Sequence, residues 1–274
     1  NTFNTLYKLE RYNGHFYNWY DTVTMQPLYP RYISVVDSGN LAAHLITLKQ
    51  GLFNLPHSPI LSYKNFWGTY DSLQIVYEHL KKEKRNECQK LLASLQEVCE
   101  STGSNIFEFK ASLDDFSEKF NGFYNSISDD DKSELYWWIV SLQQNTEAIY
   151  DSLKKFTPWV FHSNIPLPYK EHALFSTIPN LIELSELKNG FHELSAAEGL
   201  NTAEKEWLAQ IKDEVIAASN KGASLLLNIQ KQAIACEHFS DFEYDFLYDT
   251  SQHLFVIGYN VEEHRRDASC YDLL

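Results

Sequence analysis

Aromatic rings and carboxylates occur together in two segments of this sequence, at residues 16–22 and at residues 244–250. Each segment is followed by a turn and then by an Asp/Ser group, at residues 37–38 after the first segment and at residues 267–269 after the second. Self-similarity of this kind indicates a repeated structural unit. Two such units could face one shared site.

An aromatic face beside carboxylates suits the binding of a sugar. The apolar C–H face of a pyranose stacks on Trp or Tyr, while Asp, Asn and Arg bind its hydroxyl groups through directional hydrogen bonds. Consecutive aromatic residues cannot all point inward from a strand, because side chains alternate between its faces. We therefore expect some of Tyr17, Trp19 and Asp21 to line a second surface. The alternative is structural: buried rings, and aspartates that cap helices at ~1 kcal/mol each.

Several other kinds of site are disfavoured by the motifs and the charge. The ten histidines show no HExxH or paired spacing, and the signatures GxGxxG, GxxxxGK[ST] and GxSxG do not occur. We therefore expect no cofactor and no metal. The formal net charge of -14 would repel a phosphate backbone, so nucleic acid is not an expected partner.

The composition predicts a globular protein. At 274 residues and 44% hydrophobic content, the chain can bury a large core. Its four cysteines are far apart without a CxxC pair, which favours reduced thiols in the core. The sequence has no run of ~20 apolar residues, so we expect no direct membrane contact. It lacks an initiator Met and stops where a helix is expected to begin, which indicates a piece of a longer polypeptide.

The residues between the two segments are predicted to be helical. Apolar stripes with steps of three and four residues, as in amphipathic helices, run over residues 73–98, 109–127, 135–160 and 207–233. We interpret the first stripe as one long helix with a solvated polar run at residues 81–87, the alternative being a turn between two helices. Ser128 and the aspartates after it predict one helix start, and Asn201 with Glu204 predicts another.

A short β-hairpin is predicted near the C-terminus. Over residues 244–261, Leu254, Val256 and the aromatic residues alternate around a turn at residues 250–252. This hairpin contains the second aromatic and carboxylate segment.

Longer stretches of sequence around both segments resemble one family of proteins. Residues 11–22, with residues 28–34 and 36–41, closely resemble cyclic β-1,2-glucan synthases. Residues 246–249, 254–260 and 267–274 resemble the opening of the glucoamylase-like domain of the same family. The helical stretch between them is similar only in character. In the last of these stretches, residues 267–274, the family tends to have Tyr after Ser, whereas this chain has Cys270.

The resemblance implies a large inner-membrane protein with several catalytic parts. Such synthases join a glycosyltransferase that uses UDP-glucose, a central glucoamylase-like domain and a phosphorylase-like domain. The central domain is an (α/α)6 toroid that closes linear β-1,2-glucan into a ring, with retention of configuration. The resemblance therefore implies a mainly α fold: helical hairpins that form part of an incomplete (α/α)6 toroid, an inserted long-helix bundle, and the short β-hairpin.

On this resemblance we divide the chain into three parts. Residues 1–64 would hold the first toroid helices and an aromatic/Asp loop, residues 65–240 the helical bundle, and residues 241–274 the hairpin and the start of the glucoamylase-like domain. Retaining transfer needs two carboxyl groups about 5–5.5 Å apart. The toroid needs more helices than this chain offers, so we assign no catalytic residue and expect the piece to be inactive alone.

The expected site residues come from both segments and bind β-1,2-glucan. They are the platforms Tyr17, Trp19 and Tyr248, the hydroxyl-binding or loop-bracing residues Asp21, Asp37, Asp249 and Asp267, and the polar contacts Asn40 and Arg266. Further expected partners are other domains of the same polypeptide, on the cytoplasmic side of the inner membrane, and a second copy docked through exposed helix faces. Two alternatives stay open: a non-catalytic helical scaffold that docks the transferase and phosphorylase domains, and an endo-β-1,2-glucanase-like hydrolase.

Overall fold

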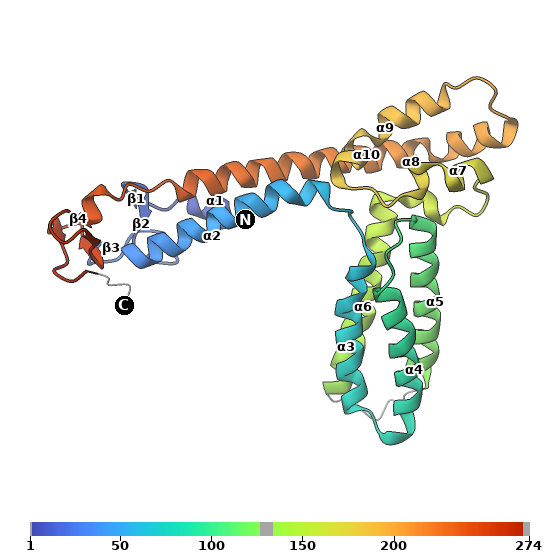
Figure 1. The fold of residues 1–274 in the computed structure, drawn as a ribbon, viewed down its shortest axis with the longest axis horizontal. Helices are drawn as coiled ribbons and strands as arrows, with labels where there is room; N and C mark the ends of the chain where they lie inside the picture. Colours follow the sequence, from blue (N-terminus) through green and yellow to red (C-terminus); the bar gives the residue numbers. More distant parts are fainter. Residues whose placement is uncertain (1, 127–133, 271–274) are drawn as a thin grey trace. The chain divides into compact units, whose positions relative to one another are not determined.

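The computed structural model describes residues 2–126 and 134–270, and these residues form two compact units (Figure 1). Unit 1 comprises Asn1–Leu55 and Leu227–Leu274, and unit 2 comprises Pro56–Leu226. Most described residues are helical and the strands are short, which confirms the predicted mainly α class. The three-part division at residues 64/65 and 240/241 stays a prediction. Among the described helices, none is both long and apolar enough to cross a bilayer.

The larger part of unit 2 is a bundle of four antiparallel helices that lie side by side in Figure 1. They are α3 (Phe66–His79), α4 (Lys82–Cys99), α5 (Ile106–Asn125) and α6 (Glu134–Phe156). The predicted apolar stripes face the interior of the bundle: Leu73, Leu95, Leu113, Leu142 and Leu153 are fully buried. Two sequence predictions, the helix start at Ser128 and the last stripe residue Ile127, lie outside the described residues.

The prediction of one long helix over residues 73–98 was wrong. The chain leaves the helical conformation at Leu80 and Lys81, whose ψ angles are 146° and 149°, and turns from α3 into α4. Arg85 stabilises this turn, because its guanidinium donates to the carbonyl oxygens of Leu80 at 3.0 Å and Glu78 at 3.1 Å. These carbonyls have no partner within α3, so a side chain from the next helix satisfies them.

The rest of unit 2 consists of short helical segments and two longer helices, and it contains the buried indole of Trp159. Its elements are η1 (Leu55–His57, which begins in unit 1), η2 (Tyr63–Asn65), η3 (Pro158–Phe161), α7 (Leu167–Glu171), α8 (Ala173–Ser176), α9 (Leu181–Ser195) and the first part of α10 (Thr202–Ser240). Trp159 is fully buried and its Nε1 donates to the carbonyl of Phe175 at 3.1 Å. The predicted start of α10 is confirmed: Asn201 and Glu204 exchange two 2.9 Å hydrogen bonds in a capping box.

Unit 1 combines two helices with small antiparallel sheets. Its elements are α1 (Thr2–Leu6), β1 (Arg11–Tyr12), β2 (His15–Phe16), β3 (Tyr32–Ser34), α2 (Val35–Asn54), the second part of α10, η4 (Asp245–Leu247), β4 (Tyr248–Asp249), β5 (Leu254–Phe255), β6 (Gly258–Asn260) and β7 (Arg265–Arg266). The β4–β5 pair confirms the predicted hairpin. Leu45 and Leu52 of α2 pack on Ala233, Cys236 and Phe239 of α10, and this contact forms one core of unit 1.

Candidate functional site

All nine residues expected to bind glucan belong to unit 1, where one sheet joins the two repeated segments. Strand β3, which follows the first segment, pairs with β6, which follows the second, so that Ile33 lies opposite Tyr259. Strand β6 also pairs with β7, which places Arg266 opposite Tyr259 on its other side. The predicted repeat is therefore assembled in one place, although its halves are more than two hundred residues apart.

The two segments form turns with the same local geometry. In the first turn, Leu28 N donates to Trp19 O at 3.0 Å, and in the second, Val256 N donates to Leu247 O at 3.0 Å. A residue with positive φ closes each turn, namely Met25 at 59° and His253 at 56°. This equivalence shows that the sequence repeat is also a repeat of backbone structure.

Asp21 and Asp249 brace these turns. The carboxylate of Asp21 accepts from Thr24 N at 2.6 Å, Thr24 Oγ1 at 2.9 Å and Val23 N at 3.0 Å. That of Asp249 accepts from Ser251 Oγ at 2.6 Å and Ser251 N at 2.8 Å. The Thr24 hydrogen bonds lower the pKa of Asp21, and the Ser251 hydrogen bonds lower the pKa of Asp249, because they favour the ionised form. Of the two roles expected for these aspartates, this geometry serves loop bracing.

The aromatic side chains of the site differ in how much of each ring is exposed. Tyr17 is only 5% exposed and lies in a core cluster with Ile33, whereas Trp19 is 52% exposed. Tyr29, which the sequence prediction missed, is 74% exposed on the same turn region. Tyr248 is half-buried, with its ring edge-on to Phe255 at 5.4 Å between centroids. Trp19 and Tyr29 are therefore the most exposed of these four aromatic side chains, and the guanidinium of Arg31 lies over the Tyr29 ring, 5.3 Å from its centroid.

Asp37 and Asn40 lie in the first turns of α2 and are both exposed. The structural alternative, in which such an aspartate caps a helix, is wrong for Asp37: the N-cap of α2 is Ser34, whose Oγ accepts from Asp37 N at 3.2 Å. The carboxylate of Asp37 makes no hydrogen bond among the described residues. Asp37, Tyr17 and Asn18 line a small pocket of about 120 Å³.

Arg266 and Asp267 both hold the sheet together. Arg266 Nε donates to the carbonyl of Phe246 at 2.6 Å, which ties β7 to the second turn. The carboxylate of Asp267 accepts a hydrogen bond from the Tyr32 hydroxyl. Residues 267–269 follow β7 without helical structure, and the helix predicted to begin there lies outside the described residues. The sequence prediction missed Tyr32, although this residue lies within residues 28–34, one of the stretches that resemble the family.

A buried histidine beside the first turn was also missed. His15 is fully buried, with Nδ1 2.8 Å from Ser38 Oγ and Nε2 2.7 Å from the carbonyl of Glu243. Since the carbonyl can only accept, Nε2 carries the proton and Ser38 donates to Nδ1. Burial lowers the pKa of His15, against the opposing effect of Glu243. These hydrogen bonds connect β2 with α2 and with the segment that follows α10. Within the described residues, no group of His, Cys, Asp and Glu is arranged to hold a metal ion.

No protein-family model matches the chain. Over its full length the chain is 26% identical to the cyclic beta-(1,2)-glucan synthase NdvB of Rhizobium meliloti (strain 1021), and it spans 8% of the length of that protein. This similarity confirms the resemblance found in the sequence: the chain is similar from end to end to a segment of a cyclic β-1,2-glucan synthase.

Proposed function

We propose that unit 1 contributes part of the glucan-binding site of a ring-closing, transglycosylating domain in a cyclic β-1,2-glucan synthase. The observation that carries this proposal is the exposed ring of Trp19 on a turn that Asp21 braces. A ring held on a rigid turn stacks on a pyranose with little loss of conformational entropy. Tyr29 offers a second ring on the same turn region.

Polar groups for the sugar hydroxyls lie on α2. The carboxylate of Asp37 and the amide of Asn40 are exposed and make no side-chain hydrogen bond among the described residues, so both are available to a ligand. Asp21, Asp249, Arg266 and Asp267 already bond within unit 1 and would hold the turns in place. Tyr17 and Tyr248 would support the site through packing.

The proposal includes the wider arrangement that the resemblance implies. Unit 1 would form the first helices of an (α/α)6 toroid on the cytoplasmic side of the inner membrane. The acid and nucleophile required for retaining transfer would come from other parts of the polypeptide. Association of two copies through exposed helix faces also remains a proposal.

A binding titration with linear β-1,2-glucan tests this function. We expect saturable quenching or enhancement of Trp fluorescence with the β-1,2 polymer and none with a β-1,3-glucan. Trp19→Ala should abolish binding and Tyr29→Ala should weaken it. The matched control is Trp137→Ala, since Trp137 is 60% exposed but belongs to unit 2. Equal binding by Trp19→Ala and the parent chain would refute the proposed site.

The helical scaffold is the second candidate, and it is favoured by one observation. Unit 2 has its own extensive core, including Trp159, Phe109 and Phe175, and contains none of the nine expected site residues. If the chain binds neither the β-1,2-glucan nor the β-1,3-glucan, this result would favour the scaffold role. Release of new reducing ends from linear β-1,2-glucan would instead support the glucanase-like alternative.

A further inference from the structure

The pocket of about 120 Å³ beside Asp37 combines an apolar wall with a few polar groups. Its lining comes from the first segment, from α2 and from the residues after α10, and it includes Phe16, Asn18, Asp37, Ser38, Leu41 and Phe242. Asp37 is exposed and Asn18 is half-buried, so they mark the mouth of the pocket, whereas the buried Ser38 and Phe242 mark its base. The pocket is part of the proposed glucan site, because Asp37 belongs to both.

Hydrogen bonds within unit 1 fix the polar groups of this pocket. Asn18 Oδ1 accepts from Ser34 N at 3.2 Å, which leaves the amide Nδ2 of Asn18 as a donor. Among the described residues, Nδ2 makes no hydrogen bond, and it is not one of the buried atoms that lack a partner, so a ligand can reach it. Ser38 Oγ already donates to His15 Nδ1 at 2.8 Å. The pocket therefore offers a ligand the amide of Asn18 and the carboxylate of Asp37.

A hydroxyl group fits this pair of polar groups. It can donate to the carboxylate of Asp37 while it accepts from the amide of Asn18, whereas an ammonium group can only donate and an anionic group would be repelled by Asp37. The apolar side chains of Phe16, Leu41 and Phe242 favour a hydroxyl that is carried on a methylene. The expected occupant is therefore a hydroxymethyl group.

The volume of the pocket admits such a group but not a whole sugar ring. One water molecule occupies about 30 Å³ of the liquid, so the pocket corresponds to about four groups of that size. In a β-1,2-glucan the oxygens at C1 and C2 form the linkages, so the free hydroxyls are those at C3, C4 and C6. Of these, only the C6 hydroxyl is carried on a methylene outside the ring.

We propose that the pocket receives the hydroxymethyl group of one glucose unit of a β-1,2-glucan, with Asp37 accepting from its hydroxyl and Asn18 donating to it. This inference rests on the proposed function and adds a specificity to it: the site selects glucose units with a free C6 hydroxyl. Asn18 directly precedes Trp19, so their Cα atoms are about 3.8 Å apart. Neighbouring units of one glucan can therefore reach the pocket and the stacking ring together.

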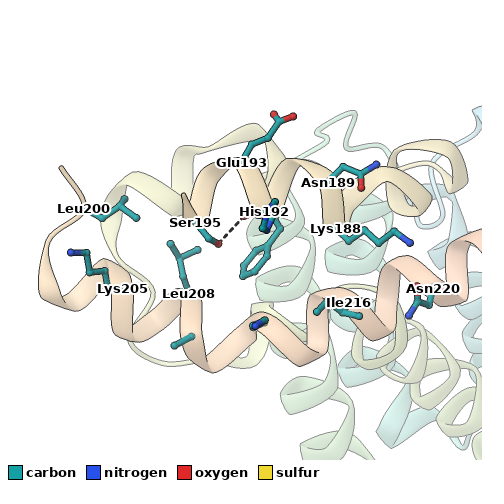
Figure 2. Close-up of a pocket in the computed structure, with 13 residues that line it drawn as sticks. Lys188, Asn189, His192, Glu193, Ser195, Leu200, Lys205, Leu208, Ile216 and Asn220 are labelled. Atoms are coloured by element: carbon teal, nitrogen blue, oxygen red, sulfur yellow. Dashed lines mark hydrogen bonds between the residues drawn. The ribbon is translucent and has the colours of Figure 1, made fainter. Parts of the chain in front are cut away.

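The larger groove of unit 2 lacks these features. It has a volume of about 940 Å³ and lies between α9 and the first part of α10 (Figure 2). The phenyl ring of Phe191 in its lining is only 5% exposed, so it offers no open face for stacking on a sugar. Asn220, which Figure 2 labels on α10, is an exposed amide of this groove and supplies a control outside the proposed site.

The test compares two ligands by isothermal titration calorimetry of the full chain. One is a linear β-1,2-linked gluco-oligosaccharide, and the other is its analogue with hydrogen in place of every C6 hydroxyl. Loss of a hydrogen bond to a charged group should weaken binding of the 6-deoxy analogue by about tenfold or more. In Asp37→Ala the two ligands should bind within about twofold of each other, because the acceptor is gone. Asn18→Asp keeps the acceptor for Ser34 N but loses the donor, and it should also reduce the preference.

Matched controls carry the same kinds of change in unit 2. Asp213→Ala and Asn220→Asp alter exposed residues of α10 and should keep the preference of the parent chain. Circular dichroism should show the same helix content in all these chains. Equal binding of the two ligands by the parent would overturn this inference and leave the proposed function intact, provided that Trp19→Ala still abolishes binding. An undiminished preference in Asp37→Ala would also overturn the inference, and no binding of either ligand by the parent would overturn the proposed function with it.

Discussion

The hydroxyl of Tyr32 donates a hydrogen bond to the carboxylate of Asp267, 235 positions later in the sequence. Tyr32 follows the first aromatic and carboxylate segment, and Asp267 follows the second, so this bond ties the two copies of the repeat together. The Tyr32 ring passes directly over Gly258 of β6, where a side chain would meet it. The repeat unit therefore depends on a glycine at position 258.

Gly258→Ala should destabilise unit 1 by about 1–3 kcal/mol. The new Cβ would meet the Tyr32 ring and lie 2.6 Å from the carbonyl of Ile33, so strand β3 or its tyrosine must shift. Chemical denaturation measures the change. Gly39→Ala is the matched control, because nothing lies within 4 Å of a Cβ there. Because Gly39 lies within α2, this substitution should stabilise the chain by about 0.5–1 kcal/mol. Equal effects of the two substitutions would contradict this account.

The free energy of unfolding should fall at mildly acidic pH because of His15. Burial lowers the pKa of His15 in the folded chain below its usual 6.5, so the unfolded chain binds the proton more readily. The stabilising contribution of neutral His15 is fully present at pH values above 6.5, the usual pKa of histidine. It is lost progressively as the pH falls toward the lowered pKa, because protonation breaks the hydrogen bond from Ser38.

Urea denaturation at a series of pH values from about 7.5 to 5 measures this effect. His15→Gln should be less stable at neutral pH and should lose less stability on acidification than the parent. His44→Gln is the control, since His44 is exposed on α2. If His15→Gln and the parent showed the same pH dependence, the buried imidazole would not be its source.

The carboxyl groups of Asp21 and Asp249 should titrate below the usual value of 3.8 for aspartate. Hydrogen bonds from Thr24 and from Ser251 favour the ionised forms of Asp21 and Asp249, respectively. Carbon-13 NMR of the side-chain carboxyls gives both midpoints. Thr24→Val should raise the midpoint of Asp21 alone, and Ser251→Ala should raise that of Asp249 alone. A midpoint of Asp21 at or above 3.8 in the parent chain would argue against the braced turn.

Arg85→Ala should destabilise the bundle of unit 2 by about 1 kcal/mol. The substitution removes the two hydrogen bonds that satisfy the last carbonyls of α3. Lys84→Ala, at the neighbouring position, removes only a surface ion pair with Glu87 at 3.4 Å and should cost less than about 0.5 kcal/mol. Thermal unfolding of both variants compares them. A larger loss for Lys84→Ala would mean that Arg85 does not stabilise the turn.

Local patterns in the sequence predicted most of the secondary structure. The steps of three and four residues from Trp207 to Ala233 lie along α10, and the Asn201–Glu204 capping box begins it as expected. The alternation around Thr250 predicted the β4–β5 hairpin. These features depend on contacts between residues close in the sequence, which a pattern records directly.

The turn between α3 and α4 could not be predicted in the same way. The apolar stripe continues from Leu73 through Leu80 to Leu91. These side chains lie before, at and after the turn, and all three are buried. A stripe that serves two consecutive helices has the same spacing as a stripe on one. The polar run at residues 81–87 left a turn open as the alternative, and the structure decides for it: Leu80 and Lys81 leave the helical conformation, and Arg85 donates to the carbonyls of Glu78 and Leu80.

The sequence by itself determined the helical class, the repeated aromatic and carboxylate segments and the resemblance that the comparison confirmed. The tertiary structure decided which members of those segments face solvent: Tyr17 is buried, whereas Trp19 and Tyr29 are exposed. It also decided that Asp37 keeps a free carboxylate while Asp267 binds Tyr32. The reason is physical, since exposure and partner choice follow from the pairing of β3 with β6, and that contact between distant residues leaves no periodic pattern in the chain.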